Sequence, residues 1–175
     1  MKLNLGAVGD ILPDYINCDL KLYADIDKAF DLRRKWPFKD SSVEEVRAFE
    51  VVEHLGDLVH FMDEAWRVLA PGGVLLVRSC LPNTENAWRD PTHVRPYSTD
   101  TYLYFDPESP WFRWGQVYTD KHWRYVDCQR VGKDAYLVKM TPRKEAVRKP
   151  SSECQDDAKN GKDGAGKQEA SGGQG

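Results

Sequence analysis

The sequence predicts an α/β fold: a mostly parallel sheet, an antiparallel hairpin near the C-terminal end, and helices on both faces. Three observations predict it. Short apolar runs typical of strands alternate with polar turns in the first half of the chain. Leu58–Leu69 then has apolar residues at the three- and four-residue spacing of a helix with one buried face. The run Val74–Ser79 is apolar on both faces, as a central parallel strand should be.

Taken in order, the first strands are expected at Lys2–Leu5, Tyr15–Cys18 and Val43–Phe49, with a weaker strand around Ala24–Phe30. Pro71-Gly72-Gly73 is expected to stop the helix and to reverse the chain tightly before Val74–Ser79.

The second half of the chain predicts fewer regular elements. Thr101–Phe105 is expected to form a short helix. His122–Val131 and Ala135–Met140 are expected to pair as a hairpin that turns near Gly132-Lys133.

The composition changes near Thr141. Six of the 13 glycines lie between Gly161 and Gly175, and no aromatic residue follows Tyr136. Such a segment buries too little apolar surface to offset the entropy lost on ordering. We therefore expect one domain over residues 1–141 and a disordered polar tail over residues 142–175, whose removal should leave thermal stability almost unchanged.

Charge and cysteine content exclude some classes of protein. The formal net charge of −3 argues against a surface built to bind phosphate backbones, although a local basic groove would escape this argument. The four cysteines have no CxxC spacing, so we expect no metal site and no disulfide framework. No apolar run approaches the length of a membrane span. These features favour a soluble, cytoplasmic protein with no membrane partner.

Two strand ends carry residues suited to a ligand. In an open α/β sheet, ligands bind beyond the carboxyl ends of the strands. Gly6 follows the first strand, where a missing side chain lets a ligand approach the backbone closely. Asp19 closes the second strand, and a carboxylate there can accept hydrogen bonds from both hydroxyls of a ribose. Taken singly, the glycine is more often a turn and the carboxylate a cap, so the combination carries the argument.

Four segments together resemble a known family. They are Leu3-Asn4-Leu5-Gly6-Ala7, Tyr15-Ile16-Asn17-Cys18-Asp19, Phe49-Glu50-Val51-Val52-Glu53-His54-Leu55 and the stretch from Arg67 to Val77. In this order they resemble the class I S-adenosylmethionine (SAM)-dependent methyltransferases, in particular the small methyltransferase type 11 group. The resemblance covers the first 80 residues well and the next 60 loosely. It implies a Rossmann-like class I methyltransferase sheet and S-adenosyl-L-methionine as the cofactor.

The resemblance also implies positions for the ribose and methionine parts of SAM. Gly6 and Ala7 would border the methionine, and Asp19 would hold the ribose. The sequence departs from the family here, because Val8 occupies the place of a second glycine. Only the eight residues Val8–Tyr15 separate this motif from the second strand, too few for the usual first helix.

For the rest of the cofactor, the resemblance points to two later segments. Asp31 would bond the exocyclic amine of adenine, with the Leu32 backbone alongside. Glu50 would face the sulfonium region. His54 lies one helical turn further on and would line the same cleft, or would belong to an exposed helix start.

The segment Asn86–Tyr97 holds the candidate acceptor residues. His93 is the best candidate proton acceptor because its unperturbed pKa lies near neutrality, with Glu50 or His54 as the next candidates. Asp90 could orient His93, and Arg95 with Tyr97 could contact an anionic acceptor. The alternative is a structural role, in which Asp90 caps a turn and the His93 and Arg95 side chains stabilise the loop.

The leading hypothesis is a SAM-dependent methyltransferase, an enzyme acting on oxygen or nitrogen of a small metabolite or glycan precursor. Trp111, Trp114, Tyr118 and Trp123 could stack on sugars or bases, but packing of the last hairpin is favoured. The alternatives are a non-catalytic module that binds SAM or a partner, and a methyltransferase acting on nucleic acid. The oligomeric state is left open.

Overall fold

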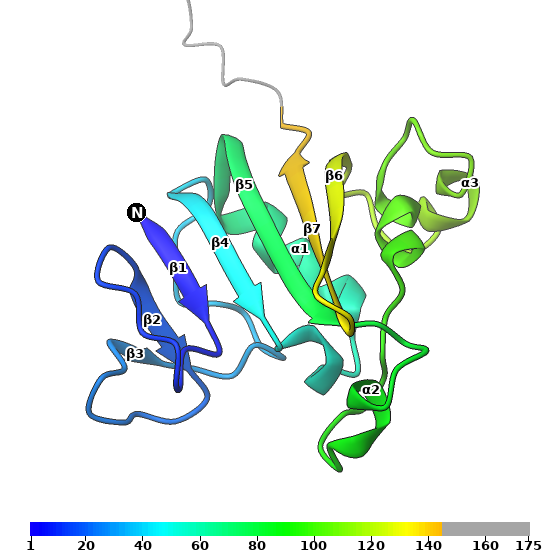
Figure 1. Ribbon diagram of the computed structural model, residues 1–175. Coiled ribbons are helices and arrows are strands. Elements are labelled where there is room, and N and C mark those ends of the chain that lie inside the picture. The colour runs from blue at the N-terminus through cyan, green and yellow to red at the C-terminus, as the bar shows by residue number, and fades with distance from the viewer. Residues whose placement is uncertain (145–175) are drawn as a thin grey trace, which may run out of the picture.

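The computed structural model describes residues 1–144, which contain a seven-stranded sheet of order β3-β2-β1-β4-β5-β7-β6 (Figure 1). The first five strands are parallel, and β7 is antiparallel to both β5 and β6. This confirms the expected sheet class. The strands are β1 (Lys2–Leu5), β2 (Ile16–Asp19), β3 (Lys28–Ala29), β4 (Val43–Phe49), β5 (Leu69–Cys80), β6 (Trp123–Val131) and β7 (Ala135–Pro142).

The helices are short except for one. They are the 3-10 turn η1 (Val52–His54), α1 (Leu58–Val68), α2 (Asn86–Arg89), the 3-10 helix η2 (Thr99–Phe105) and α3 (Phe112–Gly115). Asp57 caps α1 by accepting a hydrogen bond from the His60 amide, which satisfies one free donor of the first turn. Among residues 1–144, no helix is long and apolar enough to cross a membrane.

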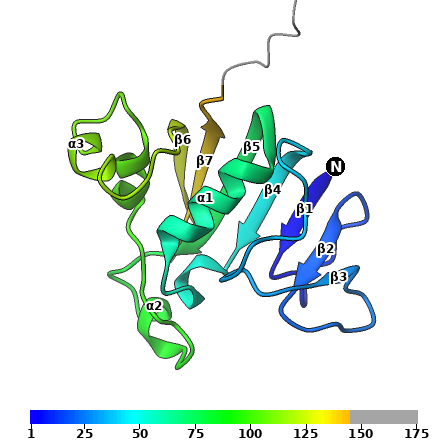
Figure 2. The ribbon, with the colours of Figure 1, turned by 180° about the vertical axis from the view of Figure 1, so that it is seen from behind.

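The main core lies between α1 and one face of the sheet (Figure 2). The helix contributes Phe61, Met62 and Ala65, which are fully buried. Because side chains alternate between the two faces of a strand, every second residue of β1, β4 and β5 joins this core. These sheet residues are Leu3, Leu5, Val46, Ala48, Leu75 and Val77, each at most 1% exposed.

The opposite face near β1 and β2 is polar. There the Val8–Tyr15 loop, which replaces a first helix as its length predicted, returns across the strands. The Asn4 side chain donates to the Asp10 carbonyl at 2.6 Å, and Arg47 forms an ion pair with the Asp10 carboxylate. Asn17 exchanges two hydrogen bonds with the Leu12 backbone. A hydrogen-bonded loop, too short for the usual first helix, thus covers this part of the face.

The Pro71-Gly72-Gly73 stretch differs from the expectation. The helix already ends at Val68, and β5 begins at Leu69. Val43 pairs with Leu69 but Glu45 pairs with Val74, so the intervening residues of β5 bulge out of the ladder, with Gly72 at φ +78°. A residue with a positive φ and a proline without an N–H suit a bulge, which explains why no separate turn forms.

The described fold runs slightly past the expected domain boundary at residue 141. Pro142 is the last residue of β7 and is buried. Arg143 pairs with Asp106 and Glu108. The Lys144 ammonium donates to the carbonyls of Arg67 and Leu69 at the end of α1. The rest of the predicted tail, residues 145–175, lies outside the described residues.

Candidate functional site

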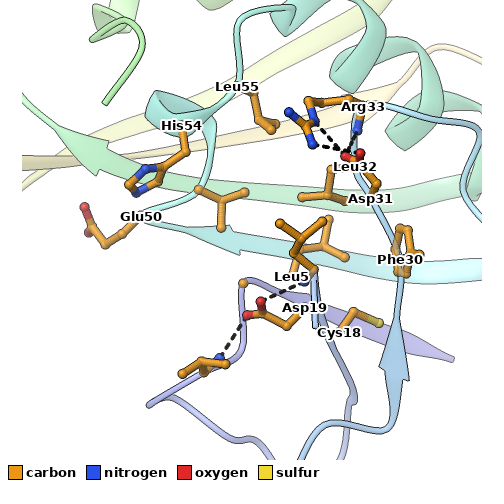
Figure 3. Close-up of a pocket in the computed structure, with 14 residues that line it drawn as sticks. Leu5, Cys18, Asp19, Phe30, Asp31, Leu32, Arg33, Glu50, His54 and Leu55 are labelled. Atoms are coloured by element: carbon orange, nitrogen blue, oxygen red, sulfur yellow. Dashed lines mark hydrogen bonds and ion pairs between the residues drawn. The ribbon is translucent and has the colours of Figure 1, made fainter. Parts of the chain in front are cut away.

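A cavity of about 410 Å³ opens at the carboxyl ends of β1, β2, β3 and β4, the edge where the order of the parallel strands reverses (Figure 3). This volume lies within the range of small-molecule pockets. The cavity is lined by Leu5, Gly6, Val8, Cys18, Asp19, Leu20, Phe30, Asp31, Leu32, Arg33, Glu50, Val51, His54 and Leu55. Six predicted cofactor residues therefore share one cavity: Gly6, Asp19, Asp31, Leu32, Glu50 and His54.

Gly6 forms the floor of the cavity in a conformation that needs glycine. Its φ is +69°, in the left-handed region. A Cβ at this position would lie 2.4 Å from Val51 Cγ2. The neighbouring Ala7 is fully buried and is held by a hydrogen bond from its amide to the Cys18 carbonyl. Ala7 is thus absent from the cavity wall and supports the loop from below.

Asp19 ends β2 with its carboxylate held in place. One oxygen accepts from the Leu20 amide at 2.7 Å and the other from the Val8 amide at 3.3 Å (Figure 3). Because a carboxylate oxygen can accept more than one hydrogen bond, both oxygens keep capacity for a ligand hydroxyl. The two backbone amides fix the orientation of this acceptor before any ligand arrives.

Asp31 already has a partner that the sequence analysis missed. The Arg33 guanidinium binds both of its carboxylate oxygens at 2.9 Å, and the Arg33 amide adds a bond at 3.0 Å. The hydrogen bonds from the Arg33 side chain hold the pKa of Asp31 below its ordinary value. Leu32 follows with its carbonyl bound to the Trp36 indole. The spacing of two residues between Asp31 and Arg33 was the available signal for this pair.

Glu50 stands just beyond β4 with an unusual backbone. Its φ is +54°, which a side chain with a Cβ adopts only at a cost of about 1–3 kcal/mol. The Glu50 carboxylate pairs with the Arg78 guanidinium at 2.8 Å, while the Glu50 amide donates to the Arg78 carbonyl. Backbone strain of this kind concentrates at functional sites, where the surrounding structure maintains it.

Glu53 is a buried acidic residue that the sequence analysis did not assign to the site. It is fully buried, and neither carboxylate oxygen has a hydrogen-bond partner among residues 1–144. Burial raises the pKa of Glu53 to about 7, and the negative charge of Glu50 contributes to the increase. A carboxylate directly after Val51 and Val52, before Leu55, was the available signal, since an acidic residue in an apolar run needs an explanation.

The predicted Asp90–His93 pair is arranged differently from the expectation. The ring of His93 bonds through Nδ1 to the Ala87 carbonyl at 3.0 Å, so Ala87 orients this imidazole. Asp90 Oδ1 instead accepts from the Thr92 amide and hydroxyl, and these bonds lower the pKa of Asp90. His54 lies against His93, with ring centroids 4.7 Å apart. The first cavity, which His54 lines, and the segment Asn86–Tyr97, which carries His93, therefore meet at these two histidines.

A second cavity of about 610 Å³ lies beyond Leu55 in the chain. Arg95 and Tyr97 both line it, as do Asp57, Tyr104, Trp111 and Tyr118. Tyr97 is buried and donates to the Leu55 carbonyl, so its ring also anchors the loop between the two cavities. Trp123 packs in the core as expected of the hairpin, whereas Trp111, Trp114 and Tyr118 remain 40–60% exposed.

Comparison with known proteins identifies the matching segment. Residues 15–77 match the family described as "Methyltransferase domain". A probable S-adenosylmethionine-dependent methyltransferase of Mycolicibacterium smegmatis is 44% identical over 63 residues, which make up 36% of this chain. The chain thus spans about a quarter, 24%, of that relative's length.

Two solved structures extend the similarity to the whole sheet. A SAM-dependent methyltransferase from Archaeoglobus fulgidus aligns with a TM-score of 0.56 and 14% identity over 80% of this chain and 85% of its own. The YcgJ protein of Bacillus subtilis gives the same score and identity over 82% and 92%. At such identities these structures support the fold alone. Residues 15–77 are therefore similar to methyltransferase domains, and the described sheet has the fold of these solved structures.

Proposed function

We propose that this chain transfers the methyl group of SAM to an oxygen or nitrogen of a small acceptor, such as a metabolite or glycan precursor. The observation that carries the proposal is the single cavity at the carboxyl ends of β1, β2 and β4, which gathers Gly6, Asp19 and Glu50. The cavity wall carries three carboxylates, those of Asp19, Asp31 and Glu50, and one guanidinium, that of Arg33, which pairs with Asp31. This charge suits a cationic sulfonium with ribose hydroxyls.

In this proposal the cofactor follows the strand ends. The prepositioned carboxylate of Asp19 accepts the ribose hydroxyls. Adenine occupies the apolar end near Phe30 and Leu32, with its amine toward Asp31. The methionine part passes over Gly6, where a side chain would block the backbone. The sulfonium then lies near Glu50 and His54.

The acceptor in this proposal enters from the second cavity. Arg95 offers a cation for an anionic group, and the Arg95 guanidinium lies 5.4 Å from the centre of the Tyr97 ring. The stacked rings of Tyr104 and Trp111, with centroids 5.9 Å apart, provide a flat wall for a sugar or an aromatic ring. A small molecule with a flat or cyclic body and one anionic group for Arg95 fits this lining, in which Asp57 and Asp100 are the other charged groups.

Methyl transfer from a sulfonium is an in-line displacement: the acceptor atom bonds the methyl carbon while the carbon–sulfur bond breaks, leaving S-adenosylhomocysteine. The protein must align the two molecules and accept any proton released. Since His93 Nδ1 donates to a carbonyl, its Nε2 carries a lone pair that can accept that proton.

The test is formation of S-adenosylhomocysteine from SAM in the presence of pooled small metabolites. We expect turnover with wild-type protein and a decrease of about 10² to 10⁴ for His93→Gln, the usual range for a positioned proton acceptor. His60→Gln, at a histidine that lines neither cavity, serves as the matched control, and melting temperatures are measured on all three proteins. Binding of SAM with no S-adenosylhomocysteine formed from any pool would instead favour a non-catalytic SAM-binding module. Normal turnover by a stably folded His93→Gln protein would remove His93 from the mechanism.

A further inference from the structure

A cluster of potential metal ligands stands at the rim of the cofactor cavity. His54, which lines the cavity, meets Asp90 and His93 of the following loop, and one ligand atom of each lies within 4.8 Å of the other two. Two atoms bound to one ion at about 2.1 Å are at most about 4.2 Å apart, so small side-chain rotations would bring all three onto a single ion.

The hydrogen bonds of both imidazoles fix the same tautomer. His93 Nδ1 faces the Ala87 carbonyl, which can only accept, so this nitrogen carries the proton. The Thr92 hydroxyl donates to Asp90 Oδ1 and therefore accepts from His54 Nδ1, which also faces the Thr92 carbonyl. In each ring the lone pair is left on Nε2. An imidazole with its other N–H held by a protein oxygen is the usual arrangement of a metal-ligating histidine.

The backbone ties the two halves of the cluster together. The Glu53 carbonyl, adjacent to His54, accepts from the amides of Val94 at 2.8 Å and Arg95 at 3.2 Å. The loop that carries His93 is thereby attached to η1, and the rings do not depend on their own contact to stay close. Ligand side chains held by hydrogen-bonded backbone need little reorganisation to bind an ion.

Nearby charge also favours a cation. Glu53 is fully buried beside His54, and its carboxylate has no hydrogen-bond partner within residues 1–144. Glu50 lies on the same side of the pocket as His54 (Figure 3). A positive charge at the histidine cluster would interact favourably with the unpartnered Glu53 carboxylate at short range, whereas the Glu50 carboxylate is already paired with Arg78.

We propose that His54, His93 and Asp90 form a binding site for a divalent first-row transition ion at the rim of the cofactor cavity. Two imidazoles and one carboxylate suit ions such as Zn²⁺ and Mn²⁺. The sequence analysis expected no metal site because the cysteines lack a metal-ligand spacing. His54 and His93 are far apart in the chain, and only the tertiary fold brings them together.

The inference rests on the proposed function in one respect, the identity of the acceptor. Three protein ligands leave at least one coordination position open. An acceptor hydroxyl bound there would lose its proton to solvent more readily, as metal-bound water does. Because the ion occupies the Nε2 lone pair of His93, it would replace that nitrogen in activating the acceptor. The acceptor is then an oxygen compound rather than an amine.

Calorimetry on the full chain, freed of metal by a chelator, tests the site directly with ZnCl₂ and MnCl₂ as probes. We expect one ion bound per chain. The affinity should decrease at least tenfold in His54→Ala and in His93→Ala, and should be unchanged in His60→Ala. Thr92→Val should weaken binding about tenfold, because it removes the hydroxyl that orients His54 and Asp90.

Asp90→Asn provides a variant that should keep the fold, because Asp90 is exposed and an amide oxygen can replace Oδ1 in the turn. It too should bind the ion more weakly. The proposal is overturned if neither ion binds at one per chain, or if both histidine variants bind as the wild type does. Titration of the same wild-type sample with S-adenosylhomocysteine separates the two proposals. If the wild type binds S-adenosylhomocysteine but no ion, only the metal site is rejected; if it binds an ion but no S-adenosylhomocysteine, only the proposed function is rejected.

Discussion

Replacing Gly6 by alanine tests the floor of the cavity, and the structure supplies the expected size of the effect. At φ +69° the new Cβ experiences left-handed strain of about 1–2 kcal/mol. The Cβ would also lie 2.4 Å from Val51 Cγ2, and overpacking a tight site costs about 1–3 kcal/mol. Val51 is 6% exposed and β-branched, so it cannot rotate away freely. We expect Gly6→Ala to lower the free energy of unfolding by about 2–5 kcal/mol.

Gly9→Ala is the matched control for this substitution. Gly9 also has a positive φ, +83°, but a Cβ there would meet nothing within 4 Å. Its cost should therefore be the backbone strain alone, about 1–2 kcal/mol. Both variants are measured by urea unfolding without cofactor, so that ligand binding does not enter the comparison.

A double-mutant cycle isolates the clash. Val51→Ala removes the methyl group that the new Cβ would strike, while Val51 Cβ itself is 3.8 Å away. In the Val51→Ala background, alanine at position 6 should cost no more than it does at Gly9, giving a coupling of about 1–3 kcal/mol. Equal costs for Gly6→Ala and Gly9→Ala in the wild-type background, or strict additivity in the cycle, would refute the reasoning.

Two further predictions concern the frame around α1. Burial raises the pKa of Glu64, but the Arg67 side chain and the Trp36 amide more than offset this and hold it below its ordinary value of 4.5. Because the pKa of Glu64 in the folded protein lies below 4.5, the ionised carboxylate stabilises the fold fully above pH 4.5. This stabilisation is lost as the pH falls through the folded-state pKa. Urea unfolding of Glu64→Gln should show a loss of about 1.5–3 kcal/mol at pH 7, the range for hydrogen bonds to a charged group, and a loss that stays constant down to pH 3 would contradict this. A chain ending at Lys144 should melt as the full chain does. One ending at Thr141 should lose about 1–3 kcal/mol, because the Lys144 bonds to the last carbonyls of α1 disappear. Equal melting temperatures of the two shortened chains would show that residues 142–144 add no stability and that the domain ends at residue 141, as first expected.

The sheet could be predicted from the sequence because its signals are local. Each parallel strand is a short apolar run bounded by polar or glycine residues, and the three- and four-residue spacing of α1 identifies its buried face. The bounds of β1 and β4 agree with the structure, and β2 begins one residue later than expected. The bulge at Pro71-Gly72-Gly73 was missed, since the same residues also suit a helix stop.

The candidate site was predictable only in part. Residues that follow a strand, such as Gly6, Asp19 and Glu50, could be placed because parallel strands end at one edge. The partners of these residues could not, because Arg78 reaches Glu50 across the sheet and His54 meets His93 through a loop of undefined path. Asp90 shows the same limit within one loop. Its carboxylate binds Thr92, two residues away, but His93, three residues away, was an equally plausible partner from the sequence.

Calorimetric titration with S-adenosylhomocysteine tests the central claim most directly, that the cavity at the carboxyl ends of the parallel strands holds the cofactor. Asp19→Ala should weaken binding at least tenfold, since a hydrogen bond to a charged group contributes about 1.5–3 kcal/mol and about 1.4 kcal/mol is a factor of ten. Asp25→Ala, an exposed carboxylate in the loop that follows β2, is the matched control and should bind as the wild type does. Equal affinities for the wild type and a folded Asp19→Ala protein, or no binding by the wild type, would contradict the account.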